Sequence, residues 1–362
     1  MTVKRITFCC GIACILLSAF MFPTAKSDID HLRWSHVALY QPAEWYGTDE
    51  AIAVAENVLL YQRNTGGWPK NIPMHHKLSE SDRQTILAAK NKTDDSTMDN
   101  DATYMESVFL AKVYNKTHTA KYKDAVLKAL NYILEAQYPN GGWPQYYPLR
   151  NGYWARITYN DDLMTNIMTL LQKIIERDPL FTFVDDPALV KRCTNAFDRG
   201  VDCILMTQYR QNGKLTGWCA QHDENTLEPA LGRSYELPSL SGGEGADVVL
   251  FLMEIKNPKP EVKTAIAAAV EWFEKVKITG IKLEYFTAED GRQDRRVVAD
   301  PQAPPVWARF YQLEDNRPFF SDRDGVKKYS LSEIGHERRN GYSWYTYTPQ
   351  KALDKYKEYS KK

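Results

Sequence analysis

Two short polar segments are the strongest candidates for chemistry in this sequence, and each joins three consecutive oxygen-bearing side chains. They are Asp99-Asn100-Asp101 in "STMDNDATYMES" and Asn160-Asp161-Asp162 in "ITYNDDLMTN", about 60 residues apart. Asp and Asn also cap helix N-termini, and an amphipathic segment follows each cluster. One cap needs only one residue, so the excess favours a hard-cation site for an ion such as calcium. Capping and cation binding both remain open, and the twelve-residue EF-hand pattern is absent.

Arginines in loop-like sequence form a second group of candidates. Arg233 stands in "ALGRSYELPSLSGG", and Arg309, Arg317 and Arg323 stand in "VWARFYQLEDNRPFFSDRDG". Arginines in an Asp-rich loop often form structural ion pairs, which is our interpretation of Arg317. Arg309 differs because it lies within the aromatic run "PVWARFY", where a solvated arginine would be unusual. Since guanidinium groups bind carboxylates in a bidentate manner, these residues suit an anionic ligand.

A repeated Gly-Trp pair indicates the elements that would position these residues. The pairs are Gly67-Trp68, Gly142-Trp143 and Gly217-Trp218, a spacing of 75 residues each time, which predicts an internal repeat. Gly ends a helix by accepting a left-handed backbone. We interpret Trp143 as packing the turn, whereas Trp68 and Trp218 could also stack on sugar rings.

Apolar periodicity predicts helices that come in pairs. The segments with helical spacing are 102–117, 122–138, 161–178, 189–209, 245–255 and 261–277. Each repeat would be a helical hairpin, and three hairpins would form an all-α-dominated (α/α)3 toroid with loops at one end lining a cleft. Residues 290–325 are rich in Pro, Asp and Arg, which predicts long irregular loops with a few short strands at most.

The N-terminus has the pattern of an export signal. Lys4 and Arg5 precede the apolar run "ITFCCGIACILLSAFMF", and "PTAKS" supplies small residues for cleavage near Ala25. We therefore expect a signal peptide over 1–25 and one catalytic domain over 26–362, secreted or periplasmic. A retained membrane anchor or a lipoprotein attached through Cys14 are weaker alternatives, since "GIAC" matches a lipobox poorly.

Charge and cysteine content narrow the partners of the exported chain. Lys plus Arg and Asp plus Glu number 46 each, and losing Lys4 and Arg5 leaves 44 basic against 46 acidic residues. No global positive field would attract nucleic acid or a membrane surface, and we expect a monomer.

Cys193, Cys203 and Cys219 remain after loss of the signal peptide, and Cys193 and Cys203 could form a disulfide or stay as buried thiols.

Six ordered motifs together resemble the family 10 polysaccharide lyases, which are pectate lyases. They are "NTGGWPKNIPM", "DNDATYMES", "QYPNGGWPQYYPL", "ITYNDDLM", "GRSYELPSLSG" and "PVWARFYQLEDNRPFFSDRDG". The resemblance covers about residues 35 to 350. It implies an (α/α)3 toroid and cleavage of polygalacturonate by β-elimination with calcium.

The resemblance also implies roles for individual residues. Asp99 and Asp161 match carboxylates that bind calcium and substrate, Arg233 matches the catalytic base, Arg309 and Arg323 match arginines that hold galacturonate carboxylates, and Asn100 would be a further substrate contact. Calcium between a substrate carboxylate and Asp161 would stabilise charge that develops when the C5 proton leaves. Since arginine normally stays protonated, hydroxide assisted by Arg233, or Lys70, are alternative bases.

Two other classes of function share parts of this pattern. "QYPNGGW" and "QRNTGGW" match the Q-x3-G-x-W motif of terpenoid cyclases, but "DNDA" and "NDDL" do not match the acidic D-x-D-D motif of those enzymes. A non-catalytic carbohydrate-binding protein would keep the aromatic turns but would not need Arg233. An unsaturated sugar product would exclude both alternatives.

Overall fold

The structure is a computed structural model, and it describes residues 29–361. The predicted signal peptide lies outside the described residues. Within the described part, no helix is both long and apolar enough to cross a membrane.

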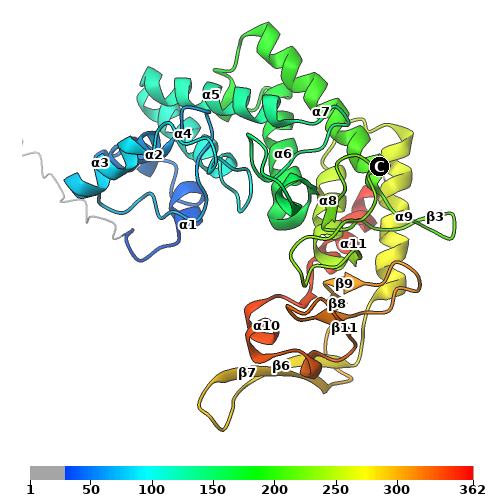
Figure 1. Cartoon of the computed structure of the whole chain (residues 1–362). Helices are drawn as coiled ribbons and strands as arrows, with labels where there is room; N and C mark the ends of the chain where they lie inside the picture. Colours follow the sequence, from blue (N-terminus) through cyan, green and yellow to red (C-terminus); the bar gives the residue numbers. More distant parts are fainter. Residues whose placement is uncertain (1–28, 362) are drawn as a thin grey trace, which may run out of the picture.

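Three helical hairpins form the centre of the molecule. They are α4 (Tyr104–Thr117) with α5 (Ala120–Ala136), α6 (Leu163–Ile175) with α7 (Pro187–Thr207), and α8 (Gly242–Leu252) with α9 (Pro260–Val276). The first helices contact one another in the order α4, α6, α8, and the second helices in the order α5, α7, α9. The hairpins therefore make an inner and an outer row that follow an arc, as Figure 1 shows. This arrangement confirms the predicted α/α toroid.

Further helices flank this double row. They are α1 (Trp34–Leu39), α2 (Asp49–Tyr61), α3 (Glu80–Ala88) and α11 (Thr348–Tyr359), whereas α10 (His336–Gly341) packs on β7 in the C-terminal part. Helices α1 and α2 pack on α4, whereas α11 packs on α8 and α9. Short 3-10 turns lie at Trp45–Gly47, Tyr153–Ala155, Asn160–Asp162, Pro179–Phe181 and Leu331–Glu333.

The Gly-Trp repeat has a structural explanation that is the same in every unit. After α5, Gln137 Nε2 donates to the carbonyl oxygen of Gly141 at 3.0 Å and to that of Ala196, on α7, at 2.8 Å. Trp143 Nε1 donates to the carbonyl oxygen of Ile133 at 2.8 Å. Gln62 and Gln208, with Trp68 and Trp218, make the corresponding bonds in the other repeats.

These bonds tie each turn to its own outer helix and to the next outer helix. Trp68, Trp143 and Trp218 are all 0% exposed, so none of them can stack on a sugar. Gly141 has φ +94°, and a Cβ there would lie 2.0 Å from the carbonyl oxygen of Arg199. Glycine is therefore required where the turn meets α7.

The strands are short except for one hairpin. The two-residue strands are β1 (Ile157–Thr158), β2 (Arg210–Gln211), β3 (Lys214–Leu215), β4 (Gln221–His222), β5 (Leu240–Ser241), β8 (Trp307–Ala308), β9 (Phe310–Tyr311), β10 (Phe320–Ser321), β11 (Lys327–Lys328) and β12 (Tyr345–Thr346). They pair as β1 with β4, β2 with β3, β5 with β9, β8 with β12, and β10 with β11, all antiparallel.

Strands β6 (Ile281–Thr287) and β7 (Gln293–Ala299) are longer than the sequence indicated. They form an antiparallel hairpin in which Glu284 lies opposite Arg296, and these side chains form an ion pair at 2.6 Å. Opposite charges across the strands stabilise such a pair without apolar alternation. The sequence allowed a few short strands in 290–325 but not one as long as β7, because cross-strand charge pairs are not visible in either strand alone.

Three free cysteines lie buried in the described residues: Cys193, Cys203 and Cys219. The interpretation as buried thiols is therefore confirmed over a Cys193–Cys203 disulfide. Burial raises the pKa of Cys193 to about 11 and that of Cys203 to about 12, so both thiols stay protonated and unreactive.

Candidate active site

The segments before the inner helices lie at equivalent positions of successive repeats. The amides of Thr97, Thr158 and Ser241 donate to the carbonyl oxygens of Trp68, Trp143 and Trp218 at 3.0, 3.2 and 2.7 Å. Each buried tryptophan thus fixes the strand-like residue that leads into the next inner helix. As a result the repeat brings residues 99–101, residues 160–162 and the start of α8 to one end of the toroid.

The two polar segments are not ordinary helix caps. Asn100, Asp101, Asp161 and Asp162 all have φ between 50° and 62°, a left-handed conformation that Asn and Asp tolerate better than most residues. Asp162 precedes α6 but its side chain makes no capping bond. At α4 the capping box is formed by Thr103 and Glu106 instead. The carboxylates of these segments are therefore available for other interactions.

Asp99 faces a cation in this structure. Its Oδ2 accepts a hydrogen bond from Lys70 Nζ, which also donates to Asn100 Oδ1 at 3.0 Å. Asp99 is 3% exposed, and its Oδ1 has no hydrogen-bond partner. Burial lowers the pKa of Lys70, but Asp99, together with Tyr146 and Asp161, outweighs burial and raises it overall. An ammonium group thus stands where the sequence predicted a metal ion.

The environment of Asp161 disfavours the charged form of its carboxylate. Burial and the nearby charge of Asp99 raise its pKa to about 6, although Arg309 acts in the opposite direction. Burial and Asp101 likewise raise the pKa of Asp162, which shares a hydrogen bond with Asp247. A divalent cation would relieve this crowding of carboxylates.

Asp99 and Asp161 therefore fit a hard cation by their chemistry and by the unpartnered oxygen of Asp99. Among residues 29–361, however, no three Asp, Glu, His or Cys side chains come together as a ready metal cage. The protein alone offers an incomplete coordination shell.

Arg309 is held rigidly at the same end of the toroid. Its Nη2 donates to Glu244 Oε1 at 2.5 Å and to Asn160 Oδ1 at 2.7 Å, and its guanidinium lies 4.3 Å from the ring centre of Tyr342. The Nε atom is buried without a hydrogen-bond partner. A donor left without an acceptor suits a ligand that brings one.

Arg233 is more exposed and pairs with a neighbour in its own loop. Its Nη2 lies 2.5 Å from Glu236 Oε1, and its side chain is 41% exposed. Although burial lowers the pKa of Arg233, the hydrogen bond and charge of Glu236 raise it well above the ordinary value. In this arrangement the guanidinium is firmly protonated.

Arg323 lies at the periphery of the site. Its side chain is 64% exposed and pairs with Glu337 at 3.1 Å. Its guanidinium lies 5.8 Å from the ring centre of Tyr235, the ring that also faces Arg233 at 5.1 Å. Arg323 does not line the cavity that holds Arg233 and Arg309.

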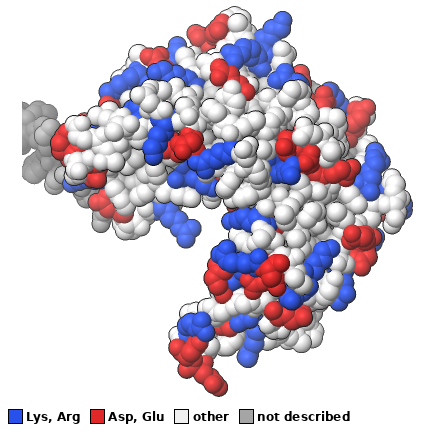
Figure 2. All heavy atoms as spheres, viewed as in Figure 1, with Lys and Arg blue, Asp and Glu red and all other residues white. Residues whose placement is uncertain are grey.

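Three adjoining cavities meet at Asp161. The central cavity is lined by Asn100, Asp161, Arg233, Arg295, Arg309, Asn340, Gly341, Tyr342 and Ser343. A second cavity, here called the C-terminal cavity, shares Asp161, Arg309 and Ser343 with it and extends to Tyr345 and Thr348. A third, the N-terminal cavity, shares Asn100 and Asp161 and extends to Asp30 and His76. Figure 2 shows Lys and Arg side chains along the hollow between the helical arc and the C-terminal part. The surroundings therefore suit a long anionic ligand.

The sequence missed several residues of the central cavity. Arg295 comes from β7, in the region 290–325 that was interpreted as loop, and Asn340 comes from α10, to which the sequence assigned no element. Arg339 pairs with Asp294 at 2.7 Å and thereby joins these two elements. The run "DRR" at 294–296 was the one available signal, and without the β6–β7 register it could not be placed.

Comparisons with known proteins agree with this geometry. The family model described as pectic acid lyase matches residues 62–353. A family 10 polysaccharide lyase from Cellvibrio cellulosa, an Asp-to-Ala mutant in complex with trigalacturonic acid, is 36% identical with a TM-score of 0.76 and covers 87% of this chain and 95% of its own. A second structure of a family 10 polysaccharide lyase from that organism is 35% identical with a TM-score of 0.76, covering 90% and 95%. No curated protein matches.

Proposed function

Because the chain belongs to the pectic acid lyase family and is a pectate lyase, we propose that it cleaves polygalacturonate by calcium-assisted β-elimination at the central cavity. The observation that carries this proposal is that Asn100, Asp161, Arg233 and Arg309 line one cavity. Family membership excludes the terpenoid cyclase alternative. The polymer presents a carboxylate on every sugar, which matches the arginines, and the related lyase was solved with a trigalacturonic acid.

The residues would divide the work of binding as follows. Arg309, whose Nε lacks a partner, would donate to a galacturonate carboxylate. Asn100 would contact the same sugar, and Arg323 would contact a carboxylate at the edge of the site. Asp99 and Asp161 would hold calcium, which when bound withdraws charge from the substrate carboxylate and so makes the C5 proton more acidic.

Arg233 would act at the C5 proton. Loss of this proton leaves an electron pair that forms the C4–C5 double bond, the bond from C4 to the glycosidic oxygen breaks, and that oxygen gains a proton from solvent. For Arg233 to accept the C5 proton it must first be neutral, and Glu236 opposes this. The alternative is that hydroxide takes the proton while Arg233 stabilises the charge. Lys70 is a poor third candidate, because Asp99 holds it as an ammonium ion.

The product tests the reaction type. The mature protein incubated with polygalacturonate should generate 4,5-unsaturated oligomers, measured by ultraviolet absorbance and mass spectrometry. Products with only saturated ends would show hydrolysis and contradict β-elimination.

The metal is tested separately. A chelator should abolish activity, and added calcium should restore it. Calorimetry should show weak calcium binding without substrate, since Asp99 and Asp161 offer few ligands. Tight binding without substrate would contradict a shell that the substrate completes.

Export is proposed on the N-terminal sequence alone. The full chain produced in a bacterium should appear in the periplasm or the medium, with an N-terminus near residue 26. Recovery of the uncleaved chain in the membrane fraction would favour an anchor instead.

A further inference from the structure

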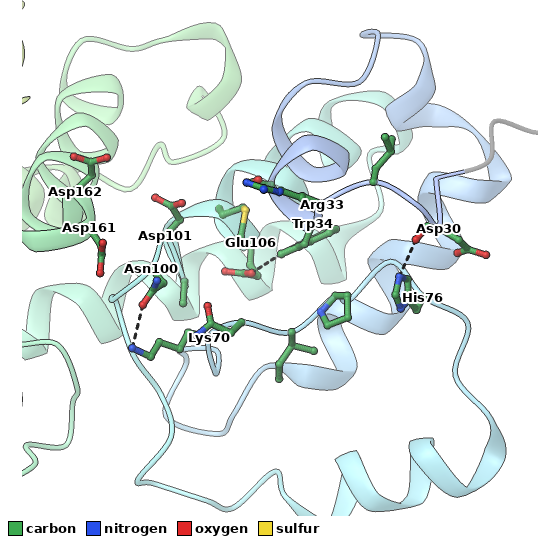
Figure 3. A pocket seen from close by; sticks show the side chains of 17 residues that line it. Asp30, Arg33, Trp34, Lys70, His76, Asn100, Asp101, Glu106, Asp161 and Asp162 are labelled. Atoms are coloured by element: carbon green, nitrogen blue, oxygen red, sulfur yellow. Dashed lines mark hydrogen bonds between the residues drawn. The ribbon is translucent and has the colours of Figure 1, made fainter. Parts of the chain in front are cut away.

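The cavities that meet at Asp161 differ in charge. In the N-terminal cavity, shown in Figure 3, acidic side chains outnumber basic ones, and they are Asp30, Asp101, Glu106, Asp161 and Asp162. The lining of the central cavity instead includes Arg233, Arg295 and Arg309, together with the ring of Tyr342. The groups that can bind the carboxylates of a polyanion are therefore gathered around Tyr342.

The ring of Tyr342 faces both arginines of the proposed mechanism. Its centre lies 4.3 Å from the guanidinium of Arg309 and 5.7 Å from that of Arg233. A guanidinium at such a distance is attracted to the face of an aromatic ring. Because the contact with Arg309 is the closer one, the ring supports mainly this arginine.

The hydroxyl of Tyr342 reaches the partner of Arg233. It donates to Glu236 Oε1 at 2.7 Å, and the same oxygen accepts from Arg233 Nη2 at 2.5 Å. Burial raises the pKa of Tyr342 well above its usual range, so the phenol keeps the proton that it donates. Glu236 Oε2 also accepts from the backbone amide of Arg233 at 2.8 Å. The hydroxyl therefore ties the loop of Arg233 and Glu236 to the segment that follows α10.

Tyr342 is itself held in one orientation. Its ring packs edge-on against the rings of Tyr235 and Trp344, with centres 5.3 and 5.0 Å away. Its carbonyl oxygen accepts a hydrogen bond from the guanidinium of Arg295. Trp344 is 1% exposed, so this support reaches into the interior of the C-terminal part. A rigid ring that orients an arginine in advance limits the entropy lost when that arginine binds a substrate.

We propose that Tyr342 is a positioning residue for both arginines. Its ring orients Arg309 for a substrate carboxylate, whereas its hydroxyl holds Glu236 and thereby keeps Arg233 directed at the C5 proton. This inference rests on the proposed function, because it assigns Tyr342 to the reaction at the central cavity. The two parts of one side chain then affect different kinetic constants, since the ring acts on KM and the hydroxyl on kcat.

Two substitutions of Tyr342 separate the ring from the hydroxyl. Tyr342→Phe keeps the ring, and it should lower kcat about tenfold while KM stays within about twofold of the wild type. Tyr342→Leu removes both parts, and it should also raise KM about tenfold because Arg309 loses its support. Steady-state kinetics on polygalacturonate with calcium measure both constants.

Tyr122→Phe is the matched control. Tyr122 on α5 also donates to a glutamate, Glu56 Oε1, at 2.6 Å, and this oxygen likewise pairs with a cation, Lys121 Nζ, at 2.7 Å. The same kind of hydrogen bond is thus lost outside the three cavities, so neither kcat nor KM should change.

A double-mutant cycle tests whether the hydroxyl acts through Glu236. In a Glu236→Ala background the acceptor is gone, so Tyr342→Phe should lower kcat by less than about twofold more. A loss of kcat that is equal with and without Glu236 overturns the role of the hydroxyl.

The remaining outcomes separate the inference from the proposed function. An unchanged KM in Tyr342→Leu overturns the role of the ring. If Tyr342→Leu does not fold, Tyr342→Phe still decides, because unchanged kcat in this variant is enough to reject Tyr342 as a positioning residue. A wild type that forms no unsaturated product rejects the proposed function itself, whereas an active wild type with equally active variants rejects only this inference.

Discussion

Arg233 forms an ion pair with Glu236, and this pair determines how the proposed base could work. Replacing Arg233 by Ala should lower kcat at least about a thousandfold, or roughly 4 kcal/mol of barrier, while the fold stays intact. Arg233→Lys should lose most of the activity too, because the ammonium differs in shape and reach. Steady-state kinetics on polygalacturonate would measure this. Near-normal kcat with a raised KM would instead make Arg233 a carboxylate clamp.

Arg309 and Arg317 provide matched comparisons for that result. Arg309→Ala should raise KM more than it lowers kcat, because Arg309 would hold the substrate. Arg317 stacks on Tyr329 at 3.5 Å and lies outside the three cavities, so Arg317→Ala should change neither constant.

Glu236→Gln separates the two candidate bases. Glu236 raises the pKa of Arg233, so removing its charge lowers that pKa. If Arg233 is the base, the alkaline rise in kcat should begin about one pH unit lower or more, because neutral arginine becomes more available. If hydroxide removes the proton, the rise should stay at the same pH. A pH–rate profile of the variant against the wild type measures the difference.

Part of the site could be predicted from residue types alone. Arg309 was recognisable because a charged residue within "PVWARFY" must be buried with partners, and the clusters around Asp99 and Asp161 held more ligands than caps require. Glu236 as a partner of Arg233 was not foreseen, since a spacing of three residues in a loop does not fix which way the side chains point. Arg295 was missed because its place depends on strand register.

At the scale of elements, the Gln-Gly-Trp turns hold the outer helices together. Gln137→Ala would leave the carbonyl oxygens of Gly141 and Ala196 without their side-chain donor, which should lower the free energy of unfolding by about 1–3 kcal/mol. Urea denaturation measures this. Gln84→Ala is the control, because Gln84 is exposed on α3 and, among residues 29–361, its side chain bonds only to Glu80. An altered KM with unchanged stability would show a ligand contact instead.

The start of α4 should make stability depend on pH. Burial raises the pKa of Glu106 to about 7, so the folded chain keeps a proton that the unfolded chain has lost. Stability should therefore rise as pH falls from 8.5 to 6.5, by about 1 kcal/mol for this group, or roughly 2 °C in Tm. Asp161 and Asp162 act in the same direction at lower pH. Below about 6.5, His222 opposes the effect, because burial lowers its pKa to about 4.

Thermal unfolding in chelator at pH 8.5 and 6.5 checks this prediction. Glu106→Gln should be less stable than the wild type but should show a smaller difference between the two pH values. An unchanged difference would mean that Glu106 is already ionised at pH 6.5.

The prediction of elements succeeded where the signal was local. Six amphipathic segments and a 75-residue repeat define the hairpins, because each helix carries its own apolar face. Helices α2 and α11 lay at the ends of the repeat and were not assigned. The β6–β7 hairpin depends on pairs such as Glu284 with Arg296, which only exist once the strands meet.

At the scale of the whole molecule, the concave face decides how a polymer can bind. The cavities run from Arg33 through Asp161 to Arg309, and Figure 2 shows the hollow open to solvent. A chain could therefore bind by an internal segment, which predicts endo cleavage. Early products from polygalacturonate should include long unsaturated oligomers, measured by a product-length time course. Release of a single short oligomer from the start would contradict this.

The buried thiols can serve as built-in probes of local unfolding. Cys193 and Cys203 lie on α7 and Cys219 follows Trp218, and each is at most 2% exposed. A thiol reagent can reach them only when the outer row or its last turn opens, so labelling rates resolved by mass spectrometry report local opening at two places. Folding requires no disulfide bond among Cys193, Cys203 and Cys219, so the chain can also be folded under reducing conditions. The three thiols then stay unmodified until the labelling reagent is added.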